Sequence, residues 1–117
     1  MTADTCAAAP AGNTARLPVR LDDAGLRLLA DPLRARILEL LAVEALCTCH
    51  LVERTGARQT NISNHLKALR EAGLVTTEPC GRFTYYALAP DALAALAGQL
   101  TALATAAEGA RHRRRPC

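Results

Sequence analysis

Hydrophobic residues recur at helical spacing through the first part of the chain. Leucines between Leu21 and Leu29 indicate a first helix. The pair Asp31-Pro32 then marks the start of a second helix, because Asp accepts hydrogen bonds from unpaired amides and Pro has no amide to leave unpaired. Apolar residues at positions i, i+4, i+7 and i+8 line one face of this second helix, which we expect to run to about Ala42.

Two further helices follow, with a tight turn between them. A short third helix over about residues 47–55 ends at Gly56, a residue that suits a helix stop. The fourth helix covers about residues 58–72 and has polar residues opposite its apolar stripe. The stripe consists of Ile62, Leu66 and Leu69. Two helices joined by a glycine turn, the second with a polar outer face, predict a helix-turn-helix.

After Gly73 the pattern changes from helical spacing to strand-forming residues. β-Branched and aromatic residues over 74–78 and 83–88 flank a segment that contains Pro and Gly. This arrangement predicts a β-hairpin with its turn at Pro79-Cys80-Gly81-Arg82. A hairpin directly after a helix-turn-helix is a wing.

Pro90 and Asp91 open a last helix whose leucines are spaced three, four and three residues apart. Such a seam usually packs against another helix, often its own copy in a dimer. The predicted fold class is therefore mainly α with a small β-hairpin, a homodimeric winged helix-turn-helix. The residues predicted for the dimer interface are Leu21, Leu28, Leu93, Leu96, Leu100 and Leu103.

The composition agrees with packed helices. The chain has 117 residues, 50% of them hydrophobic, with no Trp, one Phe and two Tyr, so its core must be aliphatic. We expect one domain over residues 20–108, preceded by a flexible arm over 1–19 and followed by a basic tail over 109–117. No apolar run approaches the roughly 18 to 20 residues that span a membrane. A cytoplasmic protein without a membrane partner is expected.

Charge is informative only locally. The net charge of +3 owes four positive charges to the arginines of the tail, and the other 10 basic residues are outnumbered by 11 acidic ones. Residues 54–82, however, carry five basic and two acidic side chains, a local excess of three. The predicted helix-turn-helix and wing therefore form the part of the chain suited to DNA.

Three stretches of the sequence resemble the ArsR/SmtB family of metal-sensing repressors. They are Asp31-Pro32-Leu33-Arg34, Leu46-Cys47-Thr48-Cys49-His50-Leu51 and the run from Asn61 to Val75. The resemblance covers about residues 21–106. It implies a homodimeric winged helix-turn-helix, not an enzyme, that binds double-stranded operator DNA when metal-free and dissociates when an inducer binds.

In that family, Leu-Cys-x-Cys before the recognition helix, the helix that enters the DNA groove, is the mark of thiolate sensors. The recognition helix corresponds here to the fourth predicted helix. The match to Cys47 and Cys49 implies As(III) or Sb(III) as inducer, with Cd(II) or Pb(II) as the alternative. Two residues depart from the arsenical pattern, because Val52 stands where a third Cys occurs and His50 replaces an Asp. The family's zinc and nickel sites on other helices have no matching residues in this chain.

Because As(III) prefers three thiolates, a further ligand is needed. Cys6 is the first choice, on an arm able to reach across a dimer; Cys80, Cys117 or no third protein thiol are the alternatives. Residues i and i+2 of a helix point about 200° apart, so Cys47 and Cys49 can share an ion only in two ways. Either Cys47 sits at the helix start, or binding unwinds the first turn. Metal capture is then expected to distort this helix and shift the recognition helix.

Polar and basic side chains of the fourth helix and the hairpin are the candidates for reading DNA. Those suited to base edges and nearby phosphates are Gln59, Thr60, Asn61, Ser63 and Asn64. Those suited to phosphates are Arg58, Lys67 and Arg70. Arg82 at the hairpin tip is suited to the minor groove. Two-fold symmetry predicts an inverted-repeat operator.

The remaining histidines and one rival function complete the predictions. His65 lies near the buried stripe and is expected to pack or hydrogen-bond within the fold. His50 can be a ligand for a borderline ion, but a role on the helix surface is favoured. A redox or persulfide sensor using Cys47 and another thiol is the alternative regulator. A thiol enzyme is disfavoured, because the chain lacks a Cys-x-x-Cys motif and a Gly-rich phosphate loop.

Overall fold

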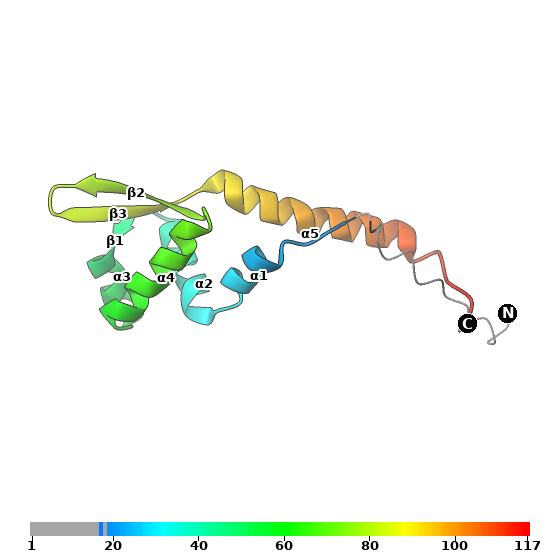
Figure 1. The fold of residues 1–117 in the computed structure, drawn as a ribbon, viewed down its shortest axis with the longest axis horizontal. Coiled ribbons are helices and arrows are strands. Elements are labelled where there is room, and N and C mark those ends of the chain that lie inside the picture. Colours follow the sequence, from blue (N-terminus) through cyan, green and yellow to red (C-terminus); the bar gives the residue numbers. More distant parts are fainter. Residues whose placement is uncertain (1–16, 18) are drawn as a thin grey trace. The chain divides into compact units, whose positions relative to one another are not determined.

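The computed structural model describes residues 17 and 19–117. The chain divides into two compact units, one over Asp22–Leu96 and one that joins the described residues up to Leu21 with Ala97–Cys117. Figure 1 shows the order of the elements along the chain. They are α1 (Asp23–Leu29), α2 (Pro32–Leu41), β1 (Leu46–Cys47), α3 (Thr48–Thr55), α4 (Gln59–Glu71), β2 (Val75–Cys80), β3 (Phe83–Leu88) and α5 (Pro90–Ala110). The predicted winged helix-turn-helix, mainly α with a small β-hairpin, is confirmed.

The ends of α2 and α3 follow from particular residues. The Asp31 carboxylate accepts hydrogen bonds from the backbone N–H groups of Leu33 at 2.9 Å and Arg34 at 3.1 Å, and Pro32 takes the first helical position. Gly56 ends α3 in the left-handed conformation, with φ of 74°. Both features are as the sequence predicts.

The core of the unit Asp22–Leu96 joins α2, α3 and α4. The predicted stripe of α4 is fully buried, with Ile62, Leu66 and Leu69 at 0% exposure. Ile37 of α2 and Leu51 of α3 are buried to the same degree. Each such side chain contributes roughly 1.5 to 3 kcal/mol of transfer free energy. Apolar burial therefore holds α4 against the two helices that precede it.

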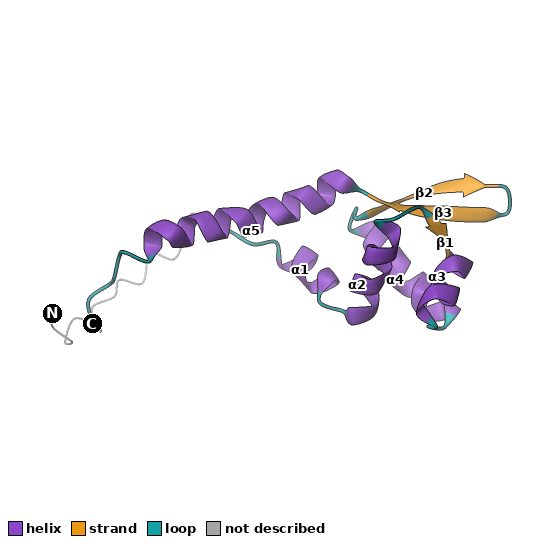
Figure 2. Ribbon diagram, turned by 180° about the vertical axis from the view of Figure 1, so that it is seen from behind, coloured by secondary structure: helices purple, strands orange, loops and turns teal. Residues whose placement is uncertain are grey.

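The sheet has one more strand than predicted. Its order is β1-β3-β2, and the strands lie on one side of α3 and α4 (Figure 2). The added strand, β1, consists only of Leu46 and Cys47, which pair antiparallel with Tyr86 and Tyr85 of β3. The segment that begins α3 is therefore tied to the wing.

The predicted turn of the hairpin was wrong in extent. β2 continues through Pro79 and Cys80, which pair with Thr84 and Phe83. This continuation is possible because β2 is an edge strand, where Pro need not donate a hydrogen bond. The turn contains only Gly81 and Arg82, and Gly81 has φ of 62°, as suits the first position of a tight hairpin turn.

The leucines predicted for a dimer interface differ in exposure. Leu96 is buried in the core, where its side chain lies so close to Gly25 that a Cβ there would be 2.6 Å from its Cδ2. Leu28 and Leu93 are partly buried against the same core. The exposed members of the set are Leu21, Leu100 and Leu103. The dimer interface stays a prediction. None of the helices in the described part of the chain combines the length and apolar character that a membrane crossing needs.

Candidate metal site and nucleic-acid interface

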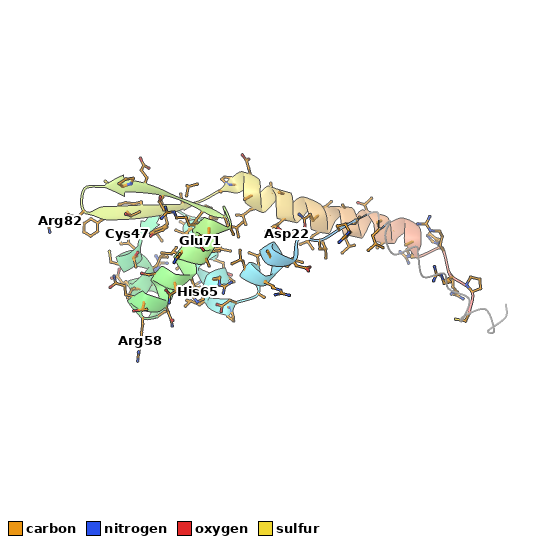
Figure 3. The ribbon with its side chains drawn as sticks, in the orientation of Figure 1. Asp22, Cys47, Arg58, His65, Glu71 and Arg82 are labelled. Carbon is orange, nitrogen blue, oxygen red and sulfur yellow. The ribbon has the colours of Figure 1, made fainter. Side chains whose placement is uncertain are left out.

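Cys47 and Cys49 lie side by side without any unwinding of α3. Cys47 is the last residue of β1 and the N-cap of α3, with extended backbone at φ −92° and ψ 172°. Because it stands outside the helix, its sulfur lies 2.8 Å from that of Cys49 in the first turn. Of the two routes that the sequence allowed, the structure shows the first. Figure 3 shows Cys47 where the sheet meets α3.

His50 is turned toward the thiols. Its Nδ1 atom lies 3.3 Å from the Cys47 sulfur and also accepts a hydrogen bond from the Cys47 backbone N–H at 3.2 Å. The two residues form a capping box at the start of α3. The two roles considered from the sequence, a ligand for a borderline ion or a residue of the helix surface, did not include this cap. The missed signal is its place three residues after the N-cap, where a side chain can reach back to the cap.

The three side chains form one cluster with a potential ligand atom each. The two sulfurs and the imidazole nitrogen of Cys47, Cys49 and His50 all lie within 4.8 Å of one another. Cys47 is buried and Cys49 is exposed. The cluster is therefore anchored on its inner side and open to solvent on its outer side.

The two thiols differ in acidity. Burial raises the pKa of the Cys47 thiol, but hydrogen bonds from the Cys49 side chain and from the His50 and Cys49 backbone outweigh it and lower this pKa below its ordinary value. The hydrogen bond to Cys47, followed by burial and the charge of the Cys47 thiolate, raises the pKa of Cys49. Cys47 is therefore the first of the pair to become a thiolate, the form that ligates metal.

An open pocket of about 260 Å³ adjoins the thiols. Cys47 and Cys49 line one part of it, and Gln59 of α4 and Arg82 of the wing line another. Gln59 and Arg82 are both predicted DNA contacts. A ligand that enters this pocket therefore meets the candidate sensing and reading residues together.

Of the other candidate cysteines, Cys117 is disulfide-bonded, and the rest lie apart or outside the description. Cys80 ends β2, is exposed, and is not a member of the cluster. Cys6 lies outside the described residues. Val52, in the place of a third thiol on α3, packs against the core instead.

All nine residues predicted to contact DNA are exposed. Eight belong to α4 or its N-cap, and Arg82 lies in the turn of the wing. Figure 3 shows Arg58 and Arg82 extending outward from the fold. The nine are Arg58, Gln59, Thr60, Asn61, Ser63, Asn64, Lys67, Arg70 and Arg82.

His65 lies on the same helix but serves the fold. Its Nδ1 accepts a hydrogen bond from Arg34 Nε at 3.0 Å, and its Nε2 lies 3.9 Å from Asp31 Oδ1. The prediction that it bonds within the protein is confirmed. It fixes α4 to the start of α2.

Comparison with known proteins identifies the family. Residues 31–77 match the model described as bacterial regulatory protein, arsR family. The chain is 40% identical over 82 residues to the HTH-type transcriptional regulator CmtR of Mycobacterium tuberculosis, covering 70% of each chain. It is 42% identical over 66 residues to the arsenic resistance transcriptional regulator ArsR1 of Pseudomonas putida, covering 56% of this chain and 52% of that one.

The fold has solved relatives as well. A crystal structure of a possible transcriptional regulator for arsenical resistance shares 37% identity and aligns with a TM-score of 0.63, covering 71% of this chain and 85% of that one. The match to the family model over residues 31–77 includes the helix-turn-helix and the first three residues of β2. The chain therefore belongs to the arsR family of bacterial regulatory proteins, which are transcriptional regulators and not enzymes.

Proposed function

We propose that the protein is a metal-responsive transcriptional repressor that senses its inducer at Cys47 and Cys49. The observation that carries this proposal is the 2.8 Å approach of the two sulfurs at the start of α3. The pocket that adjoins them is also lined by the candidate DNA contacts Gln59 and Arg82. Relatives named as arsenic resistance and arsenical resistance repressors support the same function.

In this proposal the DNA-binding form is metal-free. The nine exposed residues of α4 and the wing contact the operator, with α4 in the major groove and Arg82 in the adjacent minor groove. Residues 20–108 form the DNA-binding and dimerisation domain, and two copies associate through the exposed leucines of the predicted set, Leu21 ahead of α1 and Leu100 and Leu103 of α5. The operator is then an inverted repeat with half-sites about one helical turn apart or a multiple of it.

The inducer is As(III) or Sb(III) held by thiolates, with Cd(II) or Pb(II) as the alternative. Cys47 and Cys49 supply two thiolates, and Cys6 supplies the third that As(III) requires. Cys47 is both the N-cap of α3 and part of the sheet, so movement of its sulfur displaces both α3 and the wing. A linkage of about 1 to 3 kcal/mol per site is typical of such coupling.

A thiol redox sensor is the second candidate. The closeness of the Cys47 and Cys49 sulfurs favours it, because neighbouring thiols can be oxidised together to a disulfide. An oxidant such as peroxide would take the two electrons and leave as water. The same DNA-release measurement separates this candidate from metal sensing.

The test uses DNA that the protein selects from a random-sequence pool, labelled for fluorescence anisotropy. Arsenite, Cd²⁺ and peroxide are added in separate titrations to wild type, Cys47→Ser, Cys49→Ser and Cys80→Ser. Release of wild type and Cys80→Ser by arsenite or Cd²⁺, with both site variants still bound, supports the proposal. Normal inducer sensitivity of Cys47→Ser would refute it, and release by peroxide alone would replace it with the redox function.

A further inference from the structure

We infer that His50 is a ligand of the thiol site, through Nδ1, and that Cys47, Cys49 and His50 together take a divalent cation of the zinc and cadmium class. This inference rests on the proposed function and deepens it, since that function assigns only thiols to the site. The observation behind it is the cluster of three ligand atoms within 4.8 Å in one protomer.

The spacing of the atoms suits a small shift into a coordination shell. Tetrahedral zinc, with bonds of about 2.3 Å to sulfur and 2.0 to 2.1 Å to nitrogen, places two sulfurs about 3.8 Å apart and sulfur and nitrogen about 3.6 Å apart. The Cys47 sulfur lies 3.3 Å from His50 Nδ1 and 2.8 Å from the Cys49 sulfur. Cys49 must therefore move outward by about 1 Å. It is exposed and free to do so, whereas Cys47 is held by its pairing with Tyr85.

The chemistry of the donors selects the ion. Two thiolates and a neutral imidazole balance the charge of a divalent cation, and this mixed sulfur and nitrogen set suits zinc and cadmium. As(III) prefers three thiolates and makes no use of the imidazole. The side of the cluster that faces the 260 Å³ pocket is open to a fourth donor, such as water. His50 is therefore the residue that distinguishes the two classes of inducer.

Ligation by His50 also provides a route to the DNA-binding elements. The Nδ1 lone pair now accepts the Cys47 N–H, so a bond to metal takes this acceptor away from the capping box at the start of α3. The His50 ring also faces the ring of Tyr85 on β3, with centroids 6.1 Å apart and planes at 55°. Movement of the imidazole therefore alters both the cap of α3 and the contact with the wing.

The competing role for His50 is that of a helix cap alone. His50→Gln separates the two roles, because Gln at this position can still accept the N-cap N–H but offers no imidazole. The matched control is His112→Gln, in the exposed tail. Melting temperatures verify that both variants fold.

The experiment titrates Cd²⁺, Co²⁺ and arsenite separately into full-length wild type, His50→Gln, His112→Gln and Cys47→Ser. Charge-transfer absorption reports binding, and the visible spectrum of bound Co²⁺ reports its donors. We expect His50→Gln to weaken Cd²⁺ and Co²⁺ binding at least about tenfold. It should also alter the Co²⁺ spectrum while leaving arsenite affinity unchanged.

Three results would count against this assignment or its basis. Wild-type Cd²⁺ affinity and an unchanged Co²⁺ spectrum in His50→Gln would overturn it. An equal loss of Cd²⁺ and arsenite binding would show that His50 positions the two thiols and does not ligate the metal. If Cys47→Ser bound both Cd²⁺ and arsenite normally, the proposed function itself would fail.

Discussion

Cys47 lies directly opposite Tyr85 in the register between β1 and β3. The residue that caps α3 is therefore also a member of the sheet that forms the wing. Since the Tyr85 ring faces His50, which itself contacts the Cys47 sulfur, these three residues connect the thiols to the hairpin in two ways, through backbone pairing and through side chains.

Replacing the Tyr85 ring is expected to weaken the response to inducer more than DNA binding. Tyr85→Leu keeps an apolar strand residue but removes the ring that faces His50. We expect metal-free operator affinity to stay within about threefold, while the ratio of metal-free to metal-bound affinity falls by about fivefold or more. Anisotropy with and without Cd²⁺ measures both. Tyr86→Leu, at the position paired with Leu46, is the control, and an unchanged ratio in Tyr85→Leu would contradict this coupling.

The thiol pair should titrate in two steps on either side of the ordinary cysteine pKa. The pKa of Cys47 is lowered in part by a hydrogen bond from Cys49, so Cys49→Ala should raise the Cys47 pKa, and Cys47→Ala should lower that of Cys49. Thiolate absorbance against pH, in a background with Ser at the other three cysteines, measures these shifts. A single step with the same midpoint in all variants would exclude the coupling.

The two thiol pKa shifts make the stability of the protein depend on pH in opposite directions. Since the fold lowers the pKa of Cys47, the contribution of its thiolate is present above the unfolded pKa and lost as pH falls through the folded pKa. The raised pKa of Cys49 acts oppositely, with a contribution that is lost as pH rises through the folded value. Unfolding of wild type and Cys49→Ala at several pH values should therefore differ in pH dependence, because Cys49→Ala removes both the raised pKa of Cys49 and the hydrogen bond that lowers the pKa of Cys47.

The packing of α3 against its neighbours should dominate stability. Leu51 of α3 is fully buried in the core that α3 shares with α2 and α4. Leu51→Ala should therefore lower the free energy of unfolding by about 2 to 5 kcal/mol, because transfer free energy is lost and a cavity is left. Urea denaturation followed by circular dichroism measures the change. Val43→Ala, at a residue 80% exposed, should stay within about 0.5 kcal/mol. Equal losses in the two variants would refute this account of the core.

Arg82 should contribute to affinity through the DNA backbone and groove electrostatics. Arg82→Ala is expected to weaken binding and to reduce the slope of log affinity against log salt by about one. Asn64→Ala should instead reduce discrimination between operator and unrelated DNA. Anisotropy titrations over a salt series measure both effects, with Arg36→Ala on α2 as the control. A salt slope identical to wild type in Arg82→Ala would place the wing tip outside the interface.

Local signals in the sequence were sufficient for most of the fold. α2 and α4 were predictable because each has an apolar stripe at helical spacing, and the Asp31-Pro32 pair marked the start of α2. β1 was not, because a strand of two residues has no pattern of its own. It exists only through pairing with Tyr85 and Tyr86, far along the chain.

The site was predictable in part for the same reason. The Cys-x-Cys pair and its position before α4 were visible in the sequence, but the closeness of the sulfurs depends on the extended backbone that β1 pairing imposes on Cys47. The direction of the His50 ring depends on the cap it completes and on Tyr85. Its place three residues after the N-cap signals the first contact, but no spacing rule specifies the contact with Tyr85.

Pro79 determines how the sheet ends. It lies in β2, which forms an edge of the β1-β3-β2 sheet, and a proline has no N–H to offer a further strand. Another chain therefore finds an interrupted row of hydrogen-bond donors along this edge. The wing is protected from edge-to-edge aggregation, and the hairpin can remain exposed as a DNA-binding element without recruiting other strands.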